Sequence, residues 1–333
     1  MTAAVVVETL VKAAIVILGL LTGFAYLTLF ERKVQARLQQ RYGPNRVGPF
    51  GLLQPAADGL KLMFKSQAPP AGRDHLLYLL APMLSMSAAL AAFAIIPISG
   101  PGRITLFGHA IGWYVMNVNI GVLWYFAVTS MGVYGIFLAG WASNNKYSLL
   151  GALRSSAQMI SYEMALGLSL VPVFILARSF SLVDIVNAQR TWWFFIPLFP
   201  AFILYLVAGI AETNRAPFDL PEAETELVAG YHTEYSGMRF ALFFMAEYIN
   251  MITVSSIAAV IFLGGWWGPF GILPGPWWFL LKVVLFLYLY VWLRATLPRV
   301  RYDRLMALGW KSLLPLSLIM MMATAVVVVA AQR

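Results

Sequence analysis

The strongest constraint on this chain is a series of apolar segments, each close to the length that crosses a membrane. A helix needs about 20 apolar residues to span a bilayer core of about 30 Å. Hydrophobic residues make up 61% of the 333 positions and charged residues 11%, whereas soluble domains are about 45–50% apolar and about 25% charged. The sequence predicts an all-α polytopic membrane protein, a single integral membrane domain over residues 1–333. The eight expected spans are 6–30, 76–98, 118–142, 157–178, 192–212, 240–264, 277–297 and 312–331.

The positions of the cations predict the orientation of these spans. Most of the 23 Lys and Arg residues fall in segments that alternate spans would place on one side, and cytoplasmic loops are enriched in such residues. We therefore expect cytoplasmic loops at 31–75 and 213–239 and both termini on the periplasmic side. The first span has Lys12 in its opening turns and its cluster of cations after it, which indicates a retained anchor rather than a cleaved signal peptide. Membrane orientation explains the net charge of +9 better than nucleic-acid binding does.

The loop after the first span combines an irregular turn with an amphipathic pattern. RYGPNRVGPFG carries three glycines and two prolines, and LLQPAADGLKLMFK follows it. On a helix the apolar residues of this second stretch share one face and its charged residues the other, which predicts a short helix lying in the membrane interface. Packing of the same face on a soluble partner is the alternative, and both can hold together. The apolar face comprises Leu53, Ala56, Ala57, Leu60, Met63 and Phe64.

Acidic residues gather in one place, the stretch from Ala211 to Gly237. Of the 14 Asp and Glu residues in the chain, the six in this stretch are Glu212, Asp219, Glu222, Glu224, Glu226 and Glu234. Asp219 and Glu222 fit the start of a helix, with an acceptor at the N-cap and a glutamate three positions later. Capping does not explain the remaining acids. A cluster of like charges would make its protonation depend on whatever binds beside it.

Three glutamates fall inside expected spans or at their ends. Glu163 lies in the fourth span, Glu212 closes the fifth and Glu247 lies in the sixth, all toward the expected cytoplasmic side. No Lys or Arg shares a span with them at ion-pair spacing, and buried carboxyls without a cation tend to exchange protons near neutral pH. Because ionisable groups inside a membrane are costly, they mark functional sites by default. We expect a proton relay; the alternative is a protonated glutamate that joins two helices by a hydrogen bond.

The chain offers few ligands for a redox metal. It contains no cysteine and three scattered histidines. Iron–sulfur clusters are held mainly by cysteine thiolates, and structural zinc by cysteine and histidine. We expect no metal site and no redox centre in this chain, so that any redox metal would lie on a partner.

Four motifs together resemble one family. The sequences ERKVQAR, RYGPNRVGPFGLLQPAADGLKLMFK, AGWASNNKYSLLGALRSSAQMISYE and ETNRAPFDLPEAETELVAGYHTEYS are similar to the H subunit of bacterial respiratory complex I, the proton-pumping NADH:quinone oxidoreductase, whose mitochondrial counterpart is subunit 1. The resemblance runs from about Leu18 to Arg304.

The resemblance implies a membrane-arm subunit of the cytoplasmic (inner) membrane at the junction with the hydrophilic arm. The family forms most of the quinone tunnel, with ubiquinone or menaquinone as substrate. A hydrophilic partner carries the terminal iron–sulfur cluster, and small membrane subunits and antiporter-like subunits are further partners. The chain itself would bind no FMN, cluster or metal.

The resemblance also implies roles for particular residues of this chain. A buried relay would consist of Glu163, Glu212 and Glu247, and a coupling loop of Asp219, Glu222, Glu224 and Glu226. The residues that would line or support the quinone tunnel are Glu31, Arg32, Arg41, Arg46, Asp58, Arg215 and Phe218.

One position departs from some members of the family. These carry a glutamate in the third span, where this chain has Ser130, so a relay here would use Ser130, Tyr134 or water. Two other functions stay open: the equivalent subunit of a membrane-bound hydrogenase or of a quinone-linked dehydrogenase with another electron donor, and a stand-alone secondary transporter. Transporters usually show paired repeats with broken helices, and no such repeat is evident in this sequence.

Overall fold

The computed structural model describes residues 3–106, 109–219, 228–271 and 274–331. Nearly all of this is helix, which confirms the all-α prediction. Short helical turns lie at Pro49–Gly51, Gly230–His232 and Pro269–Gly271, and a π-helical turn lies at Leu308–Leu313. The helices are α1 (Ala3–Leu38), α2 (Gln54–Phe64), α3 (His75–Phe93), α4 (Gly121–Ala142), α5 (Lys146–Ala177), α6 (Leu182–Ala188), α7 (Phe199–Glu212), α9 (Gly237–Ile261), α10 (Pro276–Thr296), α11 (Tyr302–Ala307) and α12 (Leu314–Ala331).

Seven of the described helices are long and apolar enough to cross a membrane. The exception among the expected spans is α7, whose 14 residues rise about 21 Å at about 1.5 Å per residue. The first part of the expected span 192–212 forms turns, because Pro197 and Pro200 lack the N–H groups that a helix needs there. The fourth helix begins eleven positions earlier than expected, at Lys146, because Asn145 caps it by accepting a hydrogen bond from the Tyr147 amide at 2.9 Å.

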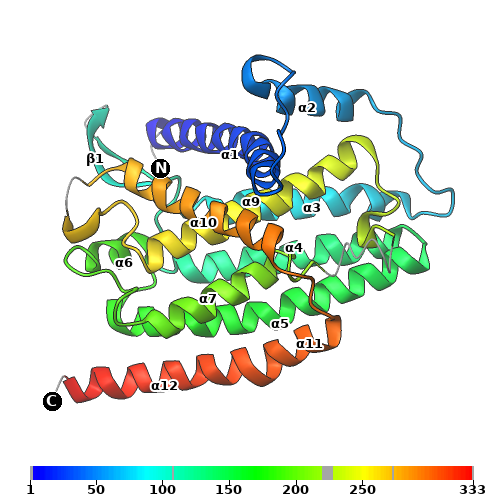
Figure 1. The fold of residues 1–333 in the computed structure, drawn as a ribbon. Coiled ribbons are helices and arrows are strands. Elements are labelled where there is room, and N and C mark those ends of the chain that lie inside the picture. The colour runs from blue at the N-terminus through cyan, green and yellow to red at the C-terminus, as the bar shows by residue number, and fades with distance from the viewer. Residues whose placement is uncertain (1–2, 107–108, 220–227, 272–273, 332–333) are drawn as a thin grey trace.

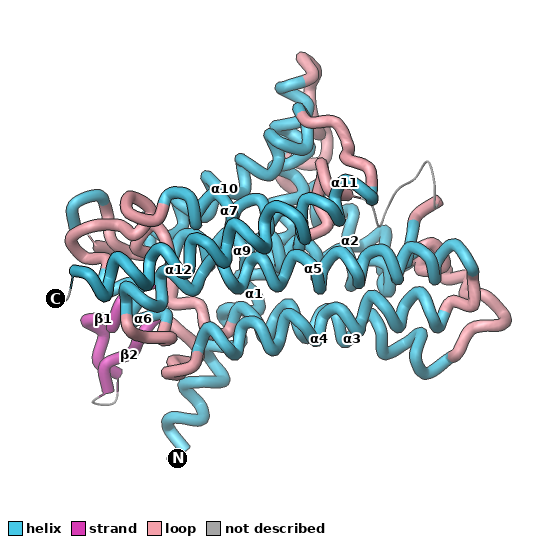
Figure 2. The backbone as a smooth tube through the Cα atoms, turned by 90° about the horizontal axis from the view of Figure 1, so that it is seen from below, coloured by secondary structure: helices cyan, strands magenta, loops and turns pink. Residues whose placement is uncertain are grey.

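The helices form a bundle in which α9 is central. α3 packs on α4 and α9, α5 packs on α4, α7 and α12, and α10 packs on α9. α1 crosses the bundle obliquely on the side of α9 and α10 (Figures 1 and 2). α9 is buried over Met251–Ile261, as expected for a helix surrounded by others. Its hydroxyls are satisfied within the helix, for instance Ser255 Oγ donates to the Met251 carbonyl at 2.8 Å.

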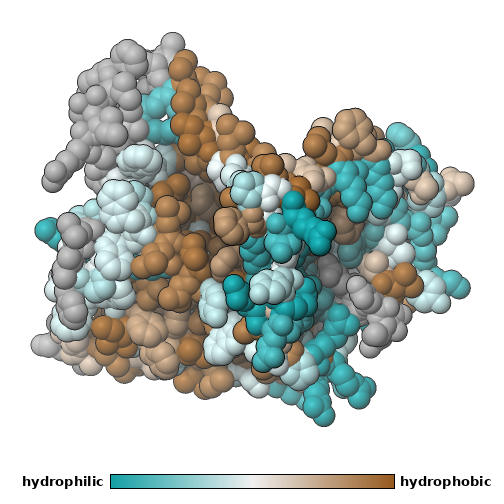
Figure 3. Space-filling model, turned by 45° about the horizontal axis from the view of Figure 1, so that its top comes forward, coloured by the Kyte–Doolittle hydropathy of each residue, from teal (hydrophilic) through white to brown (hydrophobic). Residues whose placement is uncertain are grey.

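A two-stranded antiparallel hairpin, β1 (Ser99–Leu106) and β2 (His109–Trp113), connects α3 to α4. It was not predicted. Both termini lie at the hairpin's end of the bundle, whereas α2 and α11 lie at the other end (Figure 1). In Figure 3, hydrophilic residues gather at the right of the view, toward the end where Figure 1 places α2, and hydrophobic residues cover much of the rest of that face. The two ends of the bundle therefore differ in polarity.

Candidate functional site

A buried arginine organises the polar interior near the α2 end. Arg215 lies in the loop after α7 and is 6% exposed. Its Nε is 2.9 Å from Glu247 Oε1, one of its terminal nitrogens is 3.6 Å from Glu31 Oε2, and its guanidinium lies 4.2 Å from the centre of the Tyr248 ring. Burial alone would lower the pKa of Arg215, but Glu247, Tyr248 and Glu31 raise that pKa above its ordinary value. Arg215 therefore stays charged although it is buried.

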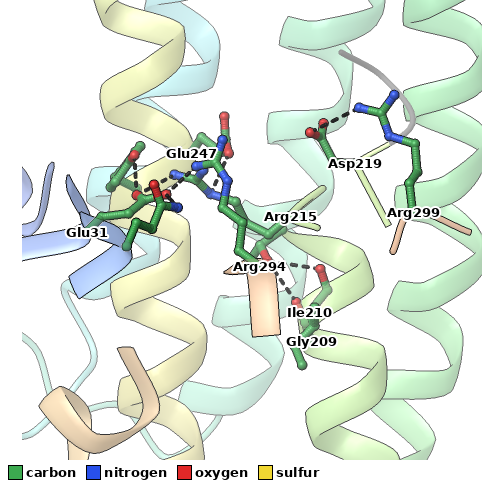
Figure 4. Close-up of polar contacts among 11 residues, drawn as sticks. Glu31, Gly209, Ile210, Arg215, Asp219, Glu247, Arg294 and Arg299 are labelled. Atoms are coloured by element: carbon green, nitrogen blue, oxygen red, sulfur yellow. Dashed lines mark hydrogen bonds and ion pairs between the residues drawn. The ribbon is translucent and has the colours of Figure 1, made fainter. Parts of the chain in front are cut away.

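Glu31 joins this arginine to two further helices. The Tyr248 hydroxyl donates to Glu31 Oε2 at 2.5 Å, and Arg294 near the end of α10 forms an ion pair with Glu31 Oε1. Figure 4 shows Glu31, Glu247, Arg215 and Arg294 converging from α1, α9, the loop after α7, and α10. We call these four residues the charged quartet. Its formal charge is zero, which limits the cost of burying it.

Two sequence interpretations need correction here. We expected Glu247 to lack a cation, because no Lys or Arg shares its helix at ion-pair spacing; in the structure Arg215 reaches it from another segment. Arg294 was treated only as a cation that orients the membrane spans, yet it forms an ion pair with Glu31. Its place in the last turn of α10 also suits the helix dipole, so the sequence held no separate signal for this contact.

Glu212 borders an internal cavity beside the charged quartet. It ends α7, is 7% exposed, and its Oε2 has no hydrogen-bond partner among the residues that the structure describes. The cavity measures about 40 Å³ and is also lined by Glu247, Asn214 and Asn250. One water needs roughly 10–15 Å³ on this measure and two to four polar partners. The cavity is thus large and polar enough for water between Glu212 and Glu247.

Glu163 contacts Ser130, the residue that departs from some family members. The Ser130 hydroxyl lies within hydrogen-bond distance of Glu163 Oε1 and also of the Phe126 carbonyl, at 2.8 Å from the latter. Because a hydroxyl has one proton, it can donate to only one of these acceptors at a time. Glu163 and Glu212 also interact electrostatically. Tyr134, by contrast, lies mainly on the surface.

Gln158 fixes the start of the acidic stretch, and sequence reasoning missed it. This fully buried amide of α5 donates to the carbonyls of Ala211 at 2.8 Å and Phe218 at 2.9 Å. It thus bridges the end of α7 to the loop that carries Arg215. The signal was present, since a polar amide inside an apolar helix five positions before Glu163 is unusual. The Phe218 ring stacks on Tyr162 at a centroid distance of 6.3 Å.

Only part of the expected coupling loop can be placed. Asp219 Oδ2 is 3.4 Å from a terminal nitrogen of Arg299, to the side of the charged quartet (Figure 4). Glu222, Glu224 and Glu226, and the helix start expected at Asp219–Glu222, fall in or extend into residues 220–227, outside the described residues.

His232 follows the acidic stretch in a buried turn and stacks on Phe240 at 5.2 Å. Burial lowers the pKa of His232 to about 4, against the opposing effect of Asp219. The imidazole is therefore neutral at physiological pH.

The remaining expected tunnel residues lie nearer the surface. Arg32 of α1 forms an ion pair with Asp58 of α2 at 2.7 Å and so joins these two helices. Arg41 and Arg46 are exposed and are not brought to the charged quartet. The turn between α1 and α2 is tight: Gly51 has φ +74°, and a Cβ there would lie 2.3 Å from the Pro44 carbonyl oxygen. The apolar face of α2 is uncovered, with Phe64 85% exposed and Leu60 55% exposed.

The fold and this interior define a class: a polytopic helical membrane protein with paired charges and carboxyls inside the bundle. A profile described as NADH dehydrogenase matches residues 11–325, and the chain therefore belongs to the NADH dehydrogenase family, as the sequence motifs indicated.

Curated relatives cover nearly the whole chain. The H subunit of the Thermomicrobium roseum NADH-quinone oxidoreductase is 57% identical over 314 residues, which are 91% of this chain and 90% of the relative. The corresponding Koribacter versatilis protein, the second of two such H subunits by its name, is 55% identical over 341 residues, 96% of each chain. Subunit 8 of the Thermus thermophilus NADH-quinone oxidoreductase is 54% identical over 318 residues, 95% of this chain and 86% of the relative. These matches identify a membrane subunit of a multisubunit enzyme complex.

Proposed function

We propose that this chain, as the H subunit of a NADH-quinone oxidoreductase, forms most of the quinone-binding chamber and couples quinone reduction to proton translocation. The observation that carries the proposal is the cavity bordered by Glu212 and Glu247 directly beside the charged quartet. A carboxyl with an unpaired oxygen, a wet cavity and an ion pair in contact form a set through which a change in charge at one end alters proton affinity at the other.

The proposed route for protons runs inward from the charged quartet. Glu247 belongs to both the quartet and the cavity, Glu212 borders the cavity, and Glu163 interacts with Glu212 and contacts Ser130. Asp219 and the acids after it would form the coupling loop that responds to quinone chemistry. The electrons would come from an iron–sulfur cluster of a hydrophilic partner, so this chain would hold ubiquinone or menaquinone without carrying a redox cofactor itself.

The direct test is to purify the complex that contains this chain from its native membrane in mild detergent. We expect iron–sulfur signals and NADH oxidation by an added quinone that quinone-site inhibitors block. A complex that contains clusters but oxidises only another donor would favour the hydrogenase-like or alternative-donor relatives. Recovery of the intact chain alone would favour a transporter.

The entrance to the chamber would lie between α1 and α2. The ion pair between Arg32 and Asp58 joins these helices, and an interfacial helix with an uncovered apolar face suits a hydrophobic substrate that arrives from the membrane. We expect Asp58→Arg to raise the apparent KM for quinone, because it places two cations side by side and separates the helices. The double variant Arg32→Asp/Asp58→Arg should restore much of the affinity, and Arg46→Glu should raise KM if Arg46 also borders the entrance. Unchanged quinone kinetics in Asp58→Arg would contradict this placement.

The α2 end of the bundle would face the cytoplasm of a bacterial cell, and both termini the periplasm. The motivating observations are the excess of cations in the loops of that end and the location of both termini at the other. A reporter that is active only in the cytoplasm should stay silent when it is fused before Thr2. The same reporter inserted after Gln67, in the loop between α2 and α3, serves as the positive control. Activity of the first fusion would refute this orientation.

A further inference from the structure

Lys282 is a buried cation that the proposed function does not use. It lies in α10 and is 6% exposed. Its ammonium donates to the backbone carbonyls of Leu263 at 2.5 Å, Gly265 at 2.9 Å and Trp267 at 2.7 Å, and lies 4.4 Å from the centre of the Trp193 ring. Within the described part of the chain it forms no ion pair. All three ammonium hydrogens thus find acceptors, and the positive charge is held in place without a carboxylate to neutralise it.

The segment that supplies these carbonyls is held from a second side. Gly264 and Gly265 have φ values of +70° and +49°, a left-handed turn that favours glycine and turns the carbonyls toward the ammonium. Gln189, at the end of α6, donates its side-chain amide to the carbonyls of Val260 and Ile261, each at 3.0 Å. The fixed cation therefore sits in a rigid cap at the termini end of the bundle.

A layer of aromatic rings lies beneath this cap. Phe202 of α7 lies 5.3 Å from Phe262 and 6.0 Å from Phe286 of α10, measured between ring centres. All three rings are buried. Tyr205 packs on Phe262 at 5.5 Å and interacts electrostatically with Glu212. The layer thus lies between the Glu212 region and the cap.

The order of these groups can be followed along α10. Lys282, Phe286 and Tyr290 repeat every four residues and are all buried, so they share one face of the helix. At about 1.5 Å rise per residue, Tyr290 lies about 12 Å from Lys282 along the axis. Tyr290 interacts with Glu212 and hydrogen bonds to Thr213. From the α2 end outward the sequence of groups is carboxyl, tyrosine, phenylalanine layer, lysine.

We propose that the phenylalanine layer and the Lys282 cap form the barrier that stops protons from passing between the Glu212 region and the opposite membrane surface within this chain. The inference rests on the proposed function, in which Glu212 exchanges protons. An apolar constriction excludes water, and a fixed positive charge repels protons and other cations. A chain that admits protons to its interior from one end needs such a barrier at the other, or the gradient would dissipate.

Passive proton flux through the whole complex in sealed liposomes tests the barrier. NADH and quinone are omitted, a pH difference is imposed with potassium and valinomycin to balance charge, and a trapped dye reports its decay. We expect the double variant Lys282→Gln/Phe262→Ala to leak several-fold faster than the unmodified complex. Lys282→Arg should leak no faster, because it keeps the charge. Lys12→Gln is the matched control, since Lys12 is a lysine of a spanning helix at the same end whose partner is Glu8.

A further variant tests the route of the leak. Adding Glu212→Gln to the leaky variant should slow the flux, because the carboxyl is part of the path. A double variant as tight as the unmodified complex, a leak of equal size in Lys282→Arg, or a leak that Glu212→Gln leaves unchanged would each overturn the proposal. If the Phe262→Ala complex does not assemble, the milder pair Lys282→Gln/Phe286→Leu is measured by the same criteria. Turnover of Glu212→Gln alone decides the proposed function separately, because the leak assay involves no catalysis.

Discussion

Glu212→Gln is expected to lower coupled quinone reduction by about 100-fold or more, at the lower end of the ~10²–10⁴ range for positioned proton transfer, while the complex still assembles. Glutamine has nearly the same shape as glutamate and can occupy the same place beside the cavity, but it cannot take up and release a proton. The carboxyl borders the cavity with an unpaired oxygen, so its loss removes a step for which the described residues offer no second carboxyl at that position.

The measurement is NADH oxidation by quinone together with proton uptake, in the purified complex and in liposomes. Glu8→Gln is the matched control: this carboxyl also lies in a membrane-spanning helix but pairs with Lys12 at the opposite end, so it should leave turnover unchanged. Glu163→Gln should reduce the rate as well, and Ser130→Ala less so, since water can replace the lost hydroxyl. Unmodified turnover and pumping in Glu212→Gln would remove this residue from the relay.

The sequence predicted the elements of the fold more fully than the contacts between them. Runs of apolar residues report directly on burial in lipid, and a helix lies in each expected range. Their ends were less predictable, because a single cap such as Asn145 extends α5 into a polar stretch, and Pro197 and Pro200 confine α7 to Phe199–Glu212. The hairpin at Ser99–Trp113 escaped notice because short strands rich in glycine have no strong periodic pattern.

The candidate site shows the same limit. Glu31, Arg215 and Glu247 were each singled out, but their pairing could not be, because they lie on three segments that are far apart in the sequence. Arg294 had the sequence context of any cation at a helix end near the cytoplasm. Contacts of this kind depend on how helices pack, and helix spacing along the chain carries no information about that.

Arg215→Met is expected to be the most destabilising single substitution in the charged quartet. Removing one partner of a buried ion pair costs about 3–5 kcal/mol, and here it changes the formal charge of the quartet from zero to −1. Glu31 keeps Arg294 and Tyr248, but Glu247 loses its guanidinium. We expect a lower melting temperature of the purified complex, less assembled complex in the membrane, and loss of quinone reduction.

A double variant separates the charge from the packing of this arginine. Arg215→Met/Glu247→Gln returns the quartet to zero charge, so it should melt at a higher temperature than Arg215→Met alone, because no uncompensated carboxylate is left buried. Arg299→Met is the matched control, since it removes a loop cation whose pair with Asp219 lies nearer the solvent, where ion pairs contribute only about 0–1 kcal/mol. If the double variant recovers stability but not quinone reduction, the quartet is neutral for reasons of folding, and Arg215 itself is needed for the reaction. A double variant no more stable than Arg215→Met would show that the guanidinium acts through packing on Tyr248 rather than through its charge.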